Sequence, residues 1–307
     1  MRYGYCCINL SINEGKKDSE RIYTNRSLTK KTFLEGGLKK ASELALKNVQ
    51  DLEHIIEWNR DNGIMMFRMS SDLFPWCSEY ELSDLPDFEE IKKALMWCGA
   101  KSKIYNQRLT FHPSHFCVIS SLREDVVKNS IKELRQHAEI MDLMGLEQNF
   151  NYPINIHINT TKPDKESAAA RFCEAYSQLP ENVRKRLVLE NDDKPSEFNP
   201  FDLYELVHQK VGIPLTFDYL HYFCNPRDGH SEKEALQVSI STWPEGITPI
   251  THYSESRKLN EDESSKLLAH TDWIWSRNIE TYGFEIDIEF EVKMKDLALL
   301  KYLKNQA

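Results

Sequence analysis

The sequence predicts an α/β fold, built as a single (β/α)8 TIM barrel with a metal cluster at the carboxyl ends of its strands. Strand-like and helix-like segments alternate along all 307 residues, and histidines recur where the strand-like runs end. No G-x-G-x-x-G motif follows the first strand-like run. The alternation is typical of parallel α/β folds, and the missing glycines favour a barrel over a dinucleotide-binding sheet. One domain, 1–307, therefore accounts for the chain.

The expected strands are short apolar or alternating runs, at 2–9, 63–69, 107–112, 153–159, 187–190, 213–218, 247–252 and 284–291. The expected helices carry apolar residues at three- and four-residue spacing, at 36–61, 87–99, 123–145, 164–179, 200–211, 231–242, 261–279 and 293–304. Two connections, 10–31 and 70–86, are longer than barrel turns need. Long loops at this end of a barrel commonly build substrate sites.

Composition limits the class of protein. With 40% hydrophobic residues the chain can bury a large core, and it has no apolar run of roughly 18 to 20 residues, the length that crosses a membrane. The first residues are too polar after Leu10 for a signal peptide, so a cytoplasmic protein is expected. Seven scattered cysteines without a C-x-x-C pair indicate reduced thiols. A net charge of −9 disfavours indiscriminate binding to nucleic acid but leaves the partner open.

Metal-ligand residue types stand where the expected strands end. In a barrel these ends converge although they are far apart in the sequence. One polar side chain comes from each strand: Asn9, Arg68, His112, His157, Glu190, Asp218, His252 and Glu291. His221, three residues after Asp218, and His270, in the last long predicted helix, can reach the same rim.

The mixture of ligand types indicates the metal. Imidazole nitrogen with carboxylate oxygen suits Zn²⁺, Mn²⁺ or Fe²⁺, whereas oxygen alone would favour Mg²⁺ or Ca²⁺. Five histidines and three carboxylates exceed the needs of one ion, so two or three ions are expected, with Glu190 as a bridge. A divalent-metal sugar isomerase or epimerase on the same barrel stays open on these residues, although the histidine count argues against it.

Several segments resemble the UV damage endonucleases, the UvdE family. They run in the family's order from end to end: TNRSL (24–28), NVQDL through MMFRMSSDLFPW (48–76), FHPSHF (111–116), LENDD (189–193), FDYLHYFCNP (217–226) and DIEFEVKMKD (287–296). The resemblance implies a barrel related to the metal-dependent apurinic-site endonucleases, with a three-metal cluster that usually holds Mn²⁺. Zn²⁺ and Co²⁺ are the alternatives. It also implies nicking of damaged double-stranded DNA immediately 5′ to UV photoproducts.

Carried over to this chain, the resemblance assigns the metal ligands as His112, His157, Glu190, Asp218, His221, His252, His270 and Glu291. Of these, Glu190, Asp218, His252 and Glu291 are expected to hold the most buried ion and to be the catalytic centre. His112 and His157 would hold a second ion, and His221 with His270 a third. Two residues before His252, where some relatives carry a modified lysine, this chain has Ile250, which cannot ligate a metal. Water or another side chain would then complete the cluster, or one ion would bind more weakly.

The expected DNA contacts are Tyr5 and Asn9 beside the lesion, and Arg26 and Arg68 on phosphates. His115 and Phe116 occupy the place where relatives commonly carry a Gln-Tyr wedge. Because the wedge differs, an apurinic-site endonuclease with little photoproduct preference stays open. A non-catalytic damage-binding module is a third interpretation, but it would have no reason to retain a complete set of ligands. No membrane association and no obligate protein partner are expected. The remaining histidines are expected at surface or capping positions: His54, His137, His208 and His230.

Overall fold

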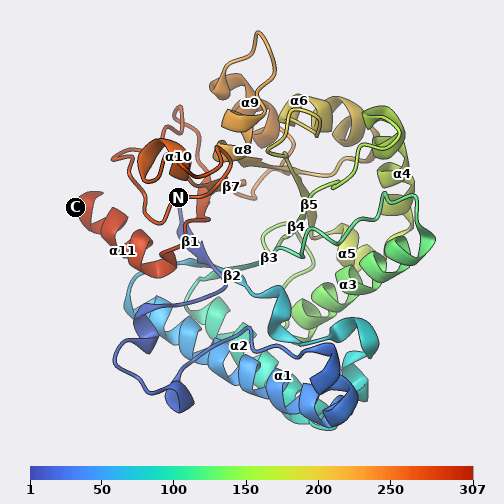
Figure 1. Ribbon diagram of the computed structural model, residues 1–307, viewed down its shortest axis with the longest axis vertical. Helices are drawn as coiled ribbons and strands as arrows, with labels where there is room; N and C mark the ends of the chain where they lie inside the picture. Colours follow the sequence, from blue (N-terminus) through green and yellow to red (C-terminus); the bar gives the residue numbers. More distant parts are fainter. Residues whose placement is uncertain (307) are drawn as a thin grey trace.

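A computed structural model describes residues 1–306, and within them eight parallel strands close into a barrel in sequence order (Figure 1). The strands are β1 Tyr3–Cys6, β2 Met66–Met69, β3 Arg108–Phe111, β4 Ile154–Ile156, β5 Leu187–Glu190, β6 Leu215–Asp218, β7 Ile250–Tyr253 and β8 Asp287–Phe290. Each strand pairs with the next, and β8 pairs with β1. The predicted barrel is therefore confirmed, and each strand lies within its expected run or extends it by one residue.

Helices surround the barrel (Figure 1). They are α1 Lys30–Asp61, α2 Phe88–Ile104, α3 Glu124–Leu143, α4 Lys165–Gln178, α5 Glu181–Arg184, α6 Pro200–Leu203, α7 Gln209–Val211, α8 Tyr219–Cys224, α9 Glu232–Ile240, α10 Arg257–Asn260 and α11 Lys295–Gln306. A π-helical turn, Tyr204–His208, joins α6 to α7. The backbone of α1 is interrupted at Gly37, which has a φ of 58°. The helix start that the sequence predicts at residue 36 therefore coincides with this break, and the observed helix begins earlier, at Lys30.

The helix predicted at 261–279 is wrong. These residues, all described, form turns and irregular backbone after α10, and Ser256 pairs with His270 in an isolated antiparallel bridge. The cause is side-chain competition for backbone N–H groups. The Glu261 carboxylate accepts hydrogen bonds from the backbone of Asp272 and Trp273, at 2.8–3.0 Å. These N–H groups therefore donate to the Glu261 side chain and form no helical hydrogen bonds.

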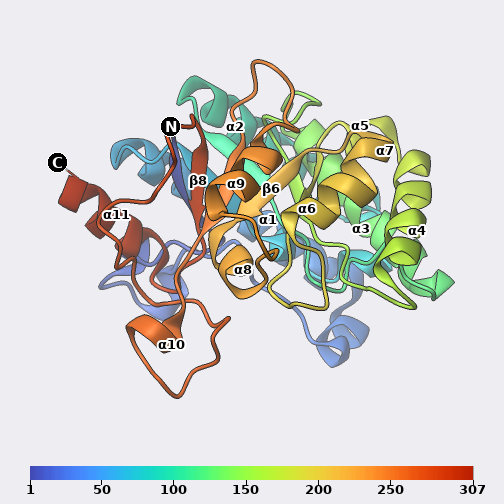
Figure 2. The same cartoon turned by 90° about the horizontal axis from the view of Figure 1, so that it is seen from above.

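The two ends of the barrel differ in character. At the amino end, the fully buried Arg108 pairs with Asp287 at 2.9 Å and donates to the carbonyls of Phe150, Asn151 and Thr248. At the carboxyl end, the irregular segment around α10 projects beyond the strands (Figure 2). No helix within residues 1–306 is both long and apolar enough to span a bilayer.

Candidate metal centre

Glu190, the last residue of β5, lies at the centre of the polar cluster and is fully buried. Its Oε2 is 3.1 Å from Nε2 of His112, 3.0 Å from Nδ1 of His252 and 3.6 Å from Nε2 of His157. Its Oε1 is 3.3 Å from Nδ1 of His221. These imidazoles come from the ends of β3, β4 and β7 and from α8. One carboxylate thus faces four imidazoles that are far apart in the sequence.

Two sets of potential ligand atoms share this carboxylate, and within each set the atoms lie within 4.8 Å of one another. The first set contains His112, Glu190, His252 and Glu291, and the second contains His157, Glu190 and His221. A shared carboxylate between two such sets has the arrangement of a bridging ligand.

Asp218 and His270 complete the predicted set of eight at the same end of the barrel. Asp218 ends β6, and its Oδ1 accepts the backbone N–H of His221 at 2.7 Å, which fixes the start of α8. The His270 ring centroid lies 6.2 Å from that of His221. His270 is held by its bridge to Ser256 and not by the predicted helix.

The residues fit a divalent-metal site because several buried polar atoms have no hydrogen-bond partner within residues 1–306. These atoms are Asp218 Oδ2 and His270 Nδ1. Glu190 Oε1 and His157 Nδ1 also form no well-aligned hydrogen bond, although His221 Nδ1 lies 3.3 Å from the first and Asp192 Oδ1 lies 3.1 Å from the second. Buried polar groups are nearly always satisfied, and leaving one unsatisfied costs about 1–3 kcal/mol. Cations bound among these atoms would satisfy them.

Backbone carbonyls orient two of the imidazoles. Nδ1 of His112 lies 2.9 Å from the carbonyl oxygen of Pro113, and Nδ1 of His221 lies 2.9 Å from that of Asn191. Each ring can donate its Nδ1–H to the carbonyl, which leaves the unprotonated Nε2 as the nitrogen that could bind a metal. This arrangement is common for metal-binding histidines, because it fixes both the tautomer and the ring orientation.

The charges at the centre are strongly coupled. Burial would raise the pKa of Glu190, but the imidazoles of His252 and His157 hold that pKa well below its ordinary value. Burial opposes a charged His157, yet the carboxylates of Glu190 and Asp192 raise its pKa to about 9. Protons on the imidazoles thus balance the negative charge of the carboxylates. Metal binding at this centre is expected to release them.

Arg68 in β2 lies inside the barrel mouth, only 7% exposed. It donates hydrogen bonds to Glu289 and Glu291, and its Nη2 lies 3.1 Å from Nε2 of His252. Glu289 is fully buried and also accepts from Oγ1 of Thr110 at 2.8 Å. The guanidinium is therefore engaged by carboxylates, and its contact with a DNA phosphate stays a prediction.

The sequence reasoning missed Glu289 and Asp192. Asp287, Glu289 and Glu291 alternate along β8, and period-two spacing places them on one face of a strand, so this pattern could have identified Glu289. Asp192, whose Oδ1 lies 3.1 Å from Nδ1 of His157, stands two residues after Glu190. The acidic residues of the LENDD segment (189–193) could have identified Asp192.

Three residues predicted to contact DNA are held within the protein. Tyr5 is fully buried, and its hydroxyl donates to Asn59 at 2.8 Å and accepts from Asn9 at 2.7 Å. Arg26 pairs with the buried Asp51 at 2.7 Å. Their contacts with DNA stay predictions.

His115 and Phe116 project from the connection between β3 and α3. Their ring centroids lie 4.0 Å apart, and Phe116 is 74% exposed. An exposed aromatic pair at the end of the barrel that carries the candidate metal centre is placed where it can meet a ligand. The wedge role stays a prediction.

Ile250 lies deeper in the barrel than His252, and it is 2% exposed. It packs in a small apolar cluster with Met66, Val188 and Trp243. Its side chain offers no ligand atom.

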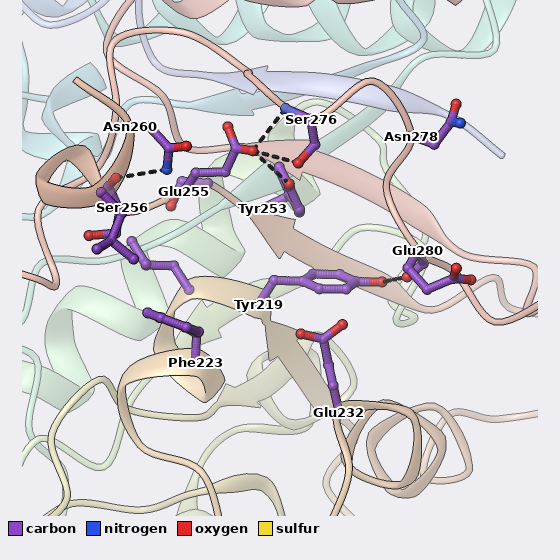
Figure 3. A pocket seen from close by; sticks show the side chains of 13 residues that line it. Tyr219, Phe223, Glu232, Tyr253, Glu255, Ser256, Asn260, Ser276, Asn278 and Glu280 are labelled. Atoms are coloured by element: carbon purple, nitrogen blue, oxygen red, sulfur yellow. Dashed lines mark hydrogen bonds between the residues drawn. The ribbon is translucent and has the colours of Figure 1, made fainter.

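A separate pocket of about 320 Å³ lies beside the metal centre, between α8 and the segment after β7 (Figure 3). Tyr219 donates to the carbonyl of Glu280 at 3.0 Å, and Glu255 accepts from Ser276. Its charged lining residues are Glu232, Glu255 and Glu280, and no lysine or arginine lines it within residues 1–306. The charged part of its lining is therefore acidic.

Comparison with known proteins identifies the family. The UV-endonuclease UvdE family matches residues 1–307. The chain belongs to the UvdE family. The resemblance seen in the sequence is thereby confirmed.

Two UvdE relatives illustrate the extent of the match. The chain is 34% identical to a UV-damage endonuclease of Schizosaccharomyces pombe over 98% of its length, and it spans 50% of that protein. It is 31% identical to a UV DNA damage endonuclease of Clostridium perfringens over 99% of its length, and it spans 70% of that protein. The chain thus spans about half the length of the first relative.

Solved structures agree with this assignment. SacUVDE superposes with a TM-score of 0.83 at 30% identity, covering 99% of this chain and 97% of that one. Endonuclease IV from Thermus thermophilus has a TM-score of 0.56 at 14% identity, covering 84% and 94%. A D-psicose 3-epimerase from Clostridium cellulolyticum has a TM-score of 0.54 at 12% identity, covering 80% and 83%. The last two share the fold alone.

Proposed function

We propose that this UvdE chain is a metal-dependent endonuclease that nicks duplex DNA immediately 5′ to UV photoproducts. The observation that carries the proposal is the buried carboxylate of Glu190, shared by two sets of potential metal ligands at the barrel mouth. The relatives' names, UV-damage endonuclease and UV DNA damage endonuclease, supply the substrate class.

In this proposal the eight clustered residues hold two or three divalent ions, with Mn²⁺ first and Zn²⁺ or Co²⁺ as alternatives. Glu190, Asp218, His252 and Glu291 hold the most buried ion, His112 and His157 a second, and His221 with His270 a third. When bound, such ions activate water and neutralise charge at the phosphodiester. No protein nucleophile is then required.

The protein's own contribution is to hold these side chains in place before the substrate arrives. Asp218 fixes the first turn of α8 and thereby His221. The carbonyls of Pro113 and Asn191 orient His112 and His221. Such fixed orientation is what outer contacts give a metal site.

Damage recognition in this proposal depends on deformation of the duplex. Separating stacked bases costs a few kcal/mol in intact DNA and less at a damaged step. The exposed His115 and Phe116 rings would enter the opened step, with Arg26 near the backbone. A histidine in the wedge keeps an apurinic-site endonuclease as the second candidate.

The test is incision of labelled duplexes that carry one photoproduct, one abasic site or no damage, each with Mn²⁺ and with EDTA. A metal-dependent nick immediately 5′ of the photoproduct is expected. Cutting at the abasic site alone would favour the second candidate. A protein that cuts none of these duplexes with Mn²⁺, Zn²⁺ or Co²⁺ would refute both, and a sugar epimerase assay would follow.

A further inference from the structure

A second pocket, of about 270 Å³, opens beside the metal centre on the side of β1 and α11. Two of its lining residues, His270 and Glu291, belong to the predicted ligand set. The complete lining is Cys6, Cys7, Arg68, His270, Glu291, Lys293 and Lys295. Three cationic side chains therefore face a space that adjoins the metal centre.

The two lysines of this pocket form no ion pair in the described part of the chain. Within residues 1–306, neither Lys293 Nζ nor Lys295 Nζ lies within 4.0 Å of a carboxylate oxygen. The carboxylate of Glu291 that shares the pocket is already engaged by Arg68. Some lysines of this acidic chain are paired, as Lys101 is with Glu53 at 2.5 Å. Positive charge is thus left unneutralised beside the metal centre.

The backbone on both walls of the pocket is strained. Cys7 has a φ of 67° and Lys295 a φ of 47°, in the left-handed region that residues other than glycine rarely adopt. Strain of this kind persists where surrounding contacts enforce it, and it concentrates at ligand sites.

The contacts that enforce it are present on each wall. The N–H of Cys7 donates to the carbonyl of Arg68 at 2.8 Å, and its carbonyl accepts from Oγ1 of Thr24 at 3.0 Å. The buried Asp296, next to Lys295, accepts the backbone N–H groups of Leu10 and Ser11, at 2.6 and 3.0 Å. Asp296 thus ties the start of α11 to the connection after β1.

We propose that this pocket binds a backbone phosphate of the DNA, with Lys293 and Lys295 as the groups that contact it. The proposal rests on the proposed function and adds the path of the nucleic acid. A phosphodiester matches the pocket because lysine ammonium groups are compact donors to phosphate. The acidic pocket of Figure 3 has the opposite charge, so the backbone passes over the lysines and avoids that side.

The test compares Lys293→Gln, Lys295→Gln and their combination with Lys304→Gln. Lys304 is an exposed residue of α11, the helix that begins at Lys295, and lies outside this pocket; its change removes the same charge. Binding to a fluorescent undamaged duplex is measured with Mn²⁺ at several salt concentrations. The slope of log K against log salt should fall by about one when both pocket lysines are removed, because contact with one phosphate is lost. Affinity at low salt should fall on the order of tenfold for the pair.

Lys295→Arg provides the control for a merely structural role, because it keeps the charge and should keep the slope. If the unchanged protein binds duplex DNA and the pocket variants match Lys304→Gln, the pocket proposal is overturned and the proposed function stands. If the unchanged protein binds neither undamaged nor photoproduct duplex, the proposed function itself fails.

Discussion

Nδ1 of His252 lies 3.0 Å from Oε2 of Glu190 and 3.2 Å from Oε1 of Glu291. The other ring nitrogen lies 3.1 Å from Nη2 of Arg68. Arginine can only donate hydrogen bonds, so in the neutral ring Nε2 accepts and Nδ1 carries the proton towards the two carboxylates. A cation at the centre of these three groups would replace that proton. His252 therefore joins the candidate metal centre to the buried Arg68.

Replacement of Glu190 by glutamine should remove the bridging charge and leave the fold intact, because the two side chains have nearly the same shape. We expect at least about a 100-fold loss of incision rate, on the scale of losses at metal sites and oxyanion donors. Metal content per chain should also fall. Glu43→Gln, the same change on the surface of α1, is the control. A Glu190→Gln protein with normal metal content and rate would refute the bridging role.

Metal removal should destabilise the folded protein, since unpaired buried atoms of Glu190 and Asp218 remain behind. At a metal concentration 100-fold above Kd, binding to the folded state contributes about 2.7 kcal/mol. The thermal midpoint should therefore rise with added Mn²⁺ and fall with EDTA. Mg²⁺ should have a smaller effect because the site is rich in imidazole. A midpoint that neither EDTA nor Mn²⁺ moves would contradict the metal assignment.

The barrel was predictable because its signals are local. Each strand is a short run between helices of regular spacing, and a polar residue stands at or near the end of each expected run. The segment 261–279 was not predictable in the same way. Its apolar residues repeat at helical spacing, but Glu255 and Glu261 bind its backbone through their side chains. Such competition depends on three-dimensional contacts that spacing does not reveal.

The candidate ligands were predictable for a related reason: strand ends converge in any barrel, whatever the distances along the chain. Burial was harder to foresee. Arg68 faces Glu289 across the barrel, 221 residues away in the sequence. Likewise His137, expected at the surface, is buried in α3 with its ring 4.6 Å from that of Phe111. Both depend on neighbours that only the closed barrel brings together.

Arg68→Met should destabilise the fold, because it leaves the fully buried Glu289 without its cationic partner. Breaking one side of a buried ion pair typically costs about 3–5 kcal/mol. The double variant Arg68→Met/Glu289→Gln should recover part of this loss, since the side chain at position 289 is then uncharged. The free energies of unfolding of Arg68→Met, Glu289→Gln and the double variant are measured by urea unfolding in EDTA. Additive effects of the two single changes would show that the pair does not couple.

His137 should make stability depend on pH. Burial lowers the pKa of His137 to about 4, whereas an unfolded histidine titrates near 6.5. Between these values the unfolded chain binds more protons, so stability falls as pH falls from 6.5 towards 4. The loss approaches about 1.4 kcal/mol per pH unit. His137→Phe should remove this part of the dependence.

The measurement is urea unfolding at pH 7 and pH 5 in EDTA, for the unchanged protein and for His137→Phe. His54→Phe, at an exposed position of α1, is the control. The difference between pH values should shrink in His137→Phe alone. An equal pH dependence in all three proteins would mean that His137 takes up its proton as readily in the folded state.

Phe116→Ala tests the exposed pair as a wedge. Phe116 is 74% exposed, so its removal should leave stability unchanged to within about 0.5 kcal/mol. If the ring fills the gap at a damaged step, the preference for photoproduct over undamaged duplex should fall, by about 1–3 kcal/mol for one base–aromatic contact. Leu122→Ala is the matched control, because Leu122 is 64% exposed in the same connection between β3 and α3. The affinities of the unchanged protein, Phe116→Ala and Leu122→Ala are measured for the photoproduct duplex and for the undamaged duplex. An equal loss of photoproduct preference in the two variants would show that Phe116 has no specific role in damage recognition.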